Sequence, residues 1–244
     1  MEPAAFALLA LAIFVVALLY SSVGHAGASG YIAVLTLFGL GVDVIRPTAL
    51  TLNILVAAIG FLQWWRGGHF VWSLFWPFAL LSVPAAFFGG WLYVPSDYLK
   101  ILLGLVLWFS AWRLLYRKED PQGIVRPSRP TAVASGAGIG FLSGLTGTGG
   151  GIFLTPLMLF CRWAKVKEAA AVSALFILVN SSSGLAGYAQ SGRELPDFAW
   201  PLAVVVAVGG FIGSRLGSRQ LPPRGMAMLL AVVLVIAGTK LVFG

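Results

Sequence analysis

Two glycine-rich segments interrupt hydrophobic stretches of this chain, and their residues are suited to binding chemistry. The first is GHAGASGY at 24–31, and the second is GLTGTGGG at 144–151. Glycine lets the backbone turn sharply and lets bare N–H groups approach a ligand closely. N–H groups at the start of a helix carry partial positive charge and bind anions. The two segments therefore predict a site for a small anion.

The candidate substrate-binding residues are turn positions with bare backbone or a polar side chain, together with one amide on the element after each turn. They are Gly24, His25, Gly27, Ser29, Gly30, Asn53, Gly147, Thr148, Gly149, Gly150, Gly151 and Asn180. His25 could contact an oxyanion or relay a proton, or its imidazole could be satisfied by a neighbouring carbonyl. Asn53 and Asn180 could line one cavity or form interhelical hydrogen bonds. Ser29 and Thr148 could contact the ligand or cap a half-helix.

The types of residue that are missing restrict the chemistry. All eight carboxylates fall at expected helix ends or connections, and the single cysteine, Cys161, permits no disulfide. We therefore expect no metal site, no cofactor and no enzyme activity. The second turn lacks the Lys-Ser/Thr ending of a phosphate-binding loop. We also expect no formal positive charge near the anion, so that neutral N–H groups and hydroxyls would select it.

Composition places these turns in a membrane. Hydrophobic residues make up 59% of the 244 residues and charged residues only 10%, with a mean hydropathy of +0.93. Apolar stretches recur from end to end, which leaves room for one integral membrane domain and for no soluble domain of useful size. The net charge of +8 would suit nucleic acid, but no basic run is interleaved with aromatic residues.

The apolar stretches form two sets of five elements. The first set is 4–22, 28–41, 47–65, 70–93 and 96–116, and the second is 131–143, 149–163, 168–190, 198–217 and 223–243. A stretch such as 28–41 reaches only about 21 Å as a helix, less than the ~30 Å hydrocarbon core. We therefore expect broken or re-entrant helices at the glycine turns, covered by protein around a central cavity. Glycines every four residues predict close helix packing at 136, 140 and 144 and at 209, 213 and 217.

A shift of 120 residues superposes Gly24 on Gly144 and Gly30 on Gly150, which indicates a duplication. We predict an all-α integral membrane protein with two inverted-topology repeats, each of about four full spans or five elements. The repeats are 1–117 and 131–244, joined by a cytoplasmic linker at 118–130. Twelve of the sixteen Lys and Arg residues then lie on the cytoplasmic side, and both termini lie outside. The remaining four basic residues, expected outside, are Arg46, Lys100, Arg193 and Lys240.

The pattern GxxGxGGGxxxxP from Gly144 to Pro156 resembles the TauE/SafE sulfite exporter family, also called transmembrane sulfur-compound permeases. A degenerate copy in the first half, and GSRL at 213–216 followed by prolines at 222 and 223, are similar to that family too. The resemblance implies a bacterial inner-membrane carrier for small sulfur-containing anions such as sulfite, thiosulfate or sulfonates. Ser29 and Tyr31 stand where the second copy has Gly149 and Gly151, so the first half departs from the pattern.

We expect alternating access around a midplane anion site at paired half-helix N-termini. The expected partners are the small anionic substrate and the lipid bilayer, with no nucleic acid. A coupling ion, H⁺ or Na⁺, passive flux and a homodimer all stay open. Two alternatives also stay open: a carrier of another small organic anion, and a membrane scaffold or sensor that transports nothing.

Overall fold

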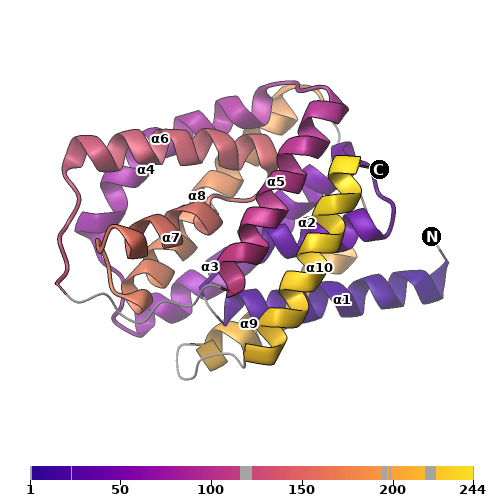
Figure 1. The fold of residues 1–244 in the computed structure, drawn as a ribbon, viewed down its shortest axis with the longest axis horizontal. Helices are drawn as coiled ribbons and strands as arrows, with labels where there is room; N and C mark the ends of the chain where they lie inside the picture. The colour runs from indigo at the N-terminus through magenta and orange to yellow at the C-terminus, as the bar shows by residue number, and fades with distance from the viewer. Residues whose placement is uncertain are drawn as a thin grey trace.

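A computed structural model describes residues 2–22, 24–115, 123–193, 197, 199–217 and 224–243. These residues form ten helices, and Figure 1 shows their arrangement. The helices are α1 (Pro3–Ser21), α2 (Ala28–Leu37), α3 (Val42–Arg66), α4 (Trp72–Trp91), α5 (Ser96–Leu115), α6 (Arg129–Thr146), α7 (Gly151–Phe160), α8 (Val166–Gln190), α9 (Ala199–Gly217) and α10 (Arg224–Phe243).

The described residues confirm an all-α membrane architecture. Five helices among them are long and apolar enough to cross a membrane: α1, α3, α4, α8 and α9. The helices after the two glycine turns, α2 and α7, have ten residues each and reach only about 15 Å. They are therefore too short to cross the ~30 Å hydrocarbon core alone, as expected for broken helices. Four full spans in each repeat stays a prediction.

Glycine faces bring two pairs of helices into backbone contact. On α6, the positions of Gly136, Gly140 and Gly144 lie directly against the backbone of α4. On α9, the positions of Gly209 and Gly213 lie in the same way against the backbone of α1, and that of Gly217 lies against Ser22, the residue after α1. A side chain at these positions would collide with main-chain carbonyls. The prediction of close packing by these glycines is confirmed.

The buried residues form two large clusters that cross the boundary between the chain halves. One cluster includes residues of α1, α2, α3, α5, α9 and α10, and the other includes residues of α4, α6, α7 and α8. The first half therefore contributes α4 to the second cluster, where it packs on α6, and the second half contributes α9 and α10 to the first, where they pack on α1 and α5. Helices α3 and α8 face each other where the clusters meet (Figure 1).

Helix α3 begins earlier than the sequence suggested. The apolar pattern predicts an element that starts at Pro47. The helix instead begins at Val42 and contains Pro47. Proline has no N–H to donate to the carbonyl of Asp43 four residues before it, and the hydroxyl of Tyr188 donates to that carbonyl at 2.9 Å. The contact from α8 thus satisfies an acceptor that the proline leaves open.

The predicted linker at 118–130 lies partly outside the described residues, and α6 already begins at Arg129. Before it, the side chain of Ser128 accepts a hydrogen bond from the N–H of Thr131 at 3.3 Å and caps the helix. The N–H of Val125 donates to the carbonyl of Arg162 at 2.9 Å. This segment therefore lies against the connection between α7 and α8.

Candidate functional site

The second glycine turn is a buried break between α6 and α7. Gly147, Gly149 and Gly150 have φ angles of +78°, +72° and +82°, a region that other L-residues rarely adopt. Within the described part of the chain, the N–H groups of residues 148–151 have no backbone acceptor. Burial of unpaired N–H groups is unfavourable unless a partner is supplied. The turn therefore presents donors to an acceptor such as an oxyanion.

Polar side chains from the two central helices surround Gly149. A Cβ atom at Gly149 would lie 2.8 Å from Nδ2 of Asn53 on α3 and 2.7 Å from Oγ of Ser181 on α8. The amide of Asn53 donates to Ser181 at 3.4 Å, and both side chains are fully buried. Oδ1 of Asn53 has no hydrogen-bond partner among the described residues. Gly149 thus lies where α3 and α8 both contribute polar groups.

His25 connects the first turn to the second. Its Nε2 lies 3.2 Å from the carbonyl oxygen of Gly151, and because a carbonyl can only accept, Nε2 carries the proton. The imidazole is buried. The two turns are thus in direct contact through this side chain, and a central cavity between them stays a prediction.

A pocket lies beside the first turn. Its lining residues come from the end of α1, the first turn, α3 and α8, and they include no charged side chain. They are Ser21, Gly24, His25, Ala26, Val56, Ala57, Gly60 and Ala174.

The other candidates of the first turn pack against α8, α1 and the turn itself. A Cβ atom at Gly24 would meet Ala170 of α8, and one at Gly27 would lie 2.8 Å from the ring of Tyr31. The position of Gly30 lies against α1, and the hydroxyl of Ser29 pairs with that of Tyr20 at 2.8 Å. These residues shape the turn and place His25.

The remaining candidates differ in their surroundings. Thr148 pairs with the hydroxyl of Thr146 at 2.9 Å, inside the second turn. The amide of Asn180 donates to the carbonyl of Phe176 on its own helix at 2.8 Å. Ser181, one residue later, is the polar α8 side chain that meets Asn53 and Gly149, and Ile177 of α8 meets Gly149 as well. The structure therefore brings together His25, Asn53 and residues 147–151.

Arg46 is a residue of this region that the candidate set lacked. Its side chain is 1% exposed and its guanidinium donates to the carbonyls of Gly144, Gly89 and Gly90, with Nη2 at 2.8 Å from Gly144 and 2.9 Å from Gly90. These carbonyls belong to the last turns of α6 and α4, where the helix dipole is negative. Arg46 therefore fastens the ends of two helices.

The expectation that no formal positive charge lies near the second turn is wrong. A Cβ atom at Gly147 would lie 3.1 Å from Cγ of Arg46. The apolar pattern starts only at Pro47, which leaves Arg46 in the connection before it. Its spacing of seven residues from Asn53, which is two helical turns, was the signal that could have placed both side chains on one face.

A second arginine lies next to Arg46. The guanidinium carbon of Arg193 lies 4.1 Å from the ring centre of Tyr188, and that of Arg46 lies 5.6 Å from the same ring. Arg193 also donates to the carbonyl of Gly90 at 2.8 Å, the same oxygen that Arg46 contacts. Unlike Arg46, Arg193 is only half-buried. Together the three side chains lead from the surface to the second turn.

Several apolar helices of spanning length, two buried glycine breaks and a polar centre define a multi-pass membrane protein of the transporter class. Comparison with known proteins agrees. The profile of the family described as Sulfite exporter TauE/SafE matches residues 9–241. The chain belongs to this family of membrane transporters and is not an enzyme.

Two relatives illustrate the similarity. A probable membrane transporter protein of Sinorhizobium fredii is 41% identical over 240 residues, which cover 96% of this chain and 97% of the relative. A probable membrane transporter protein of Methanocaldococcus jannaschii is 26% identical, over 92% of this chain and 91% of its own length. No solved structure matches the chain significantly.

Proposed function

We propose that this protein carries small sulfur-containing anions such as sulfite, thiosulfate or sulfonates across the bacterial inner membrane. The anion binds at the second glycine turn, and the two halves of the protein alternate between states open to either side. The family description, a sulfite exporter, supports the class of substrate. The second candidate, a carrier of another small organic anion, uses the same site.

The observation that carries this proposal is the set of buried N–H groups at residues 148–151 that have no backbone acceptor in the described part of the chain. These groups lie at the start of α7, where the helix dipole adds roughly half a positive charge. Asn53 and Ser181 add neutral donors beside Gly149. An oxyanion with three or four oxygens can accept several of these hydrogen bonds at once.

The route through the protein follows one face of α3. Arg46, Asn53 and Gly60 are each seven residues apart, so that they lie about 10 Å from one another along this face. Arg46 lies at the end that α4 and α6 cover, Asn53 lies at the second turn, and Gly60 lines the pocket. In the proposed route, the pocket forms the part beyond Asn53.

Helix α8 supplies the opposite wall of the route. Tyr188 contacts α3 at Asp43, Ser181 contacts Asn53, and Ala174 lines the pocket. Positions decrease along α8 as they increase along α3, so the two helices run antiparallel. Corresponding helices of two inverted repeats run in this way, which supports the proposed repeats at 1–117 and 131–244.

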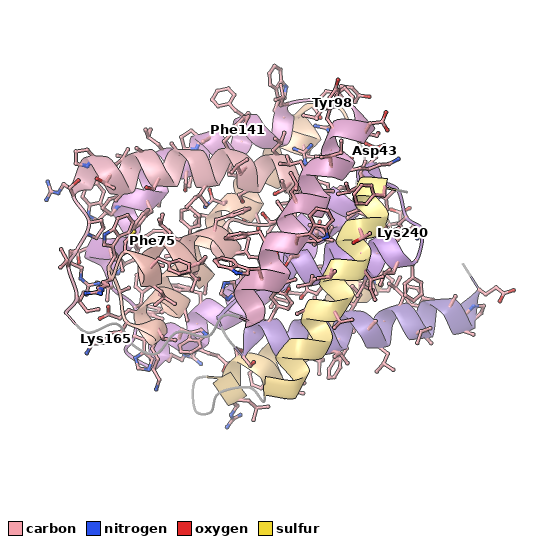
Figure 2. All side chains as sticks on the ribbon, viewed as in Figure 1. Asp43, Phe75, Tyr98, Phe141, Lys165 and Lys240 are labelled. Atoms are coloured by element: carbon pink, nitrogen blue, oxygen red, sulfur yellow. The ribbon has the colours of Figure 1, made fainter. Side chains whose placement is uncertain are left out.

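The orientation we propose places the Arg46 end outside and the Gly60 end in the cytoplasm, with both termini outside. Figure 2 supports it: Asp43, Tyr98 and Lys240 lie toward one end of the molecule, and Lys165 lies at the opposite end. The basic connection that includes Lys165 then faces the cytoplasm, as the positive-inside tendency favours.

The driving force belongs to the same proposal. Neither α3 nor α8 has a carboxylate near its middle, so a coupling proton would travel on His25 or on the substrate itself. A sodium ion held by helix-end carbonyls and passive flux are the other options, and a homodimer is compatible with all of them. Flux measured with imposed pH and sodium gradients would separate these options.

Purified protein in lipid vesicles tests the function. We expect saturable uptake of radiolabelled sulfite or thiosulfate above that of empty vesicles, and loss of uptake in a Gly149→Val variant that still inserts. Competition by unlabelled methanesulfonate and acetate distinguishes sulfur anions from other organic anions. Correctly folded protein that moves none of these anions would overturn the proposal.

A further inference from the structure

Arg46 is a buried charged residue beside the second turn, and the neutral donors of that turn do not neutralise its charge. Its side chain is 1% exposed and it lies in α3, one of the helices that can cross a membrane. Charged side chains within membrane-spanning segments are strongly unfavourable, and those that occur often line ion or substrate pathways. We therefore expect an anionic group to bind beside this guanidinium.

The described residues do not supply a full partner. Nε and Nη2 of Arg46 donate to backbone carbonyls, which carry only partial negative charge. Nη1 is buried and has no hydrogen-bond partner in the described part of the chain, which leaves out residues 194–196. In the same part, neither ion pair found involves Arg46. Asp43, on the same helix, acts on Arg46 through space without forming an ion pair with it. One donor, Nη1, is thus available to an anion.

Arg46 lies where the anion would need this charge. Its carbonyl oxygen and Cγ lie 3.0 Å and 3.1 Å from the Cβ position of Gly147. Gly147 ends α6, and the next residue, Thr148, begins the run of N–H groups without a backbone acceptor. The stem of Arg46 therefore packs on Gly147, and its guanidinium lies at the carbonyl of Gly144, three residues before Gly147 on the same glycine-rich segment.

Arg193 adds a second positive charge nearer the surface. It stacks on Tyr188 and shares the carbonyl of Gly90 with Arg46. Arg193 is half-buried, whereas Arg46 is buried. Two cations in sequence attract an anion from the aqueous side and lower the barrier to its desolvation.

We propose that Arg46 is a substrate-binding residue that supplies the formal positive charge of the anion site, and that Arg193 with Tyr188 forms the outer contact on the path to it. This inference rests on the proposed function and deepens it. In this inference the site recognises the net negative charge of the substrate through Arg46, in addition to its oxygen atoms through neutral donors.

The first test compares uptake kinetics of sulfite in vesicles. Arg46→Gln should raise KM at least about tenfold, because a hydrogen bond to a charged group is lost. Arg46→Lys, which keeps the charge, should lie between Arg46→Gln and the wild type, and Arg193→Gln should raise KM by a smaller factor. Lys100→Gln is the matched control, since the side chain of Lys100 is 43% exposed and its Nζ lies 3.9 Å from Oδ1 of Asp97. It should leave KM unchanged.

The second test needs no variant, because Arg46 also fastens α4 and α6 and its replacement could prevent folding. Methanesulfonate and methanesulfonamide have similar shape, but only the first is an anion. Methanesulfonate should inhibit sulfite uptake by the wild type at least about tenfold more strongly.

Two results would overturn the inference. One is equal inhibition by the two compounds, and the other is a folded Arg46→Gln variant whose KM stays within twofold of that of the wild type. Both leave the proposed function intact, because sulfite uptake by the wild type is still observed. A wild type that transports no anion removes the proposed function and the inference together.

Discussion

Nε2 of His25 donates to the carbonyl oxygen of Gly151 at 3.2 Å, and this hydrogen bond joins two turns that are 126 residues apart. Gly151 is the first residue of α7, and His25 precedes α2 by three residues. A displacement of either short helix therefore acts on the other turn. The bond gives the two halves a direct connection beside the proposed anion site.

Replacing His25 separates this connection from a proton relay. The His25→Gln variant can still donate an N–H to the carbonyl, so we expect it to keep most of the flux and the pH profile of the wild type. His25→Ala cannot donate, and it should lose about tenfold in flux. Uptake of sulfite across a range of pH values measures both effects. A glutamine variant that folds but loses the pH dependence of the wild type would instead assign proton transfer to His25.

Gly149 should tolerate no side chain. Alanine there would be strained by the φ of +72° and would meet Asn53 and Ser181 within 3 Å. We expect Gly149→Ala to lose transport by about tenfold or more, with strain of about 1–3 kcal/mol. The matched control is Gly39→Ala, which has a similar φ of +82° but nothing within 4 Å of the added carbon. Equal flux in the two variants would show that strain alone, and not the site, is measured.

A negative charge at Asn53 should exclude the substrate. Asn53→Asp places a carboxylate beside Gly149 and repels an anion, so we expect uptake to fall by about a hundredfold or more. Gln63→Glu is the same chemical change on the same helix, and Gln63 donates to the carbonyl of Phe211 at the edge of the protein. It should keep most of the uptake. Full uptake by the Asn53→Asp variant would show that the anion does not bind beside Asn53.

The glycine face of α6 makes a prediction about stability. Gly140→Ala drives a methyl group into the backbone of α4 at Ser82, and we expect it to destabilise the protein by about 1–3 kcal/mol. Gly138→Ala faces open space on the same helix and should be neutral or stabilise by up to about 1 kcal/mol. Thermal unfolding in detergent compares the two. Equal midpoints would argue against the close contact.

The sequence predicts the helices of this fold well, because apolar stretches and glycine breaks determine them in a membrane. All ten observed helices correspond to the ten expected elements, and the largest shift in a helix start is the five residues between Pro47 and Val42. That difference has a tertiary cause, since Tyr188 of a distant helix satisfies the carbonyl that Pro47 leaves open. No local pattern contains this contact.

The site is less predictable, because it depends on which helix faces meet. Asn180 and Ser181 are neighbours in sequence, but they point about 100° apart on a helix, and only Ser181 faces Asn53. In the sequence, Arg46 is typical of a charged residue that flanks a membrane span. Its burial becomes clear only from its contacts with the ends of α4 and α6. Runs of glycine in the sequence directly predict where the helices break. The hydrogen-bond partners of polar side chains can be identified only once the packing of the helices is known.

Locating a bound anion is the most direct test of the central claim that the glycine turn binds substrate. Selenite has the shape and charge of sulfite and gives an anomalous X-ray signal, so crystals grown with it would show its position. We predict a selenium peak between the N–H groups of residues 148–151 and the amide of Asn53, with oxygen atoms about 3 Å from these donors. A transport-active protein with its selenium peak elsewhere, and none at the turn, would contradict the account.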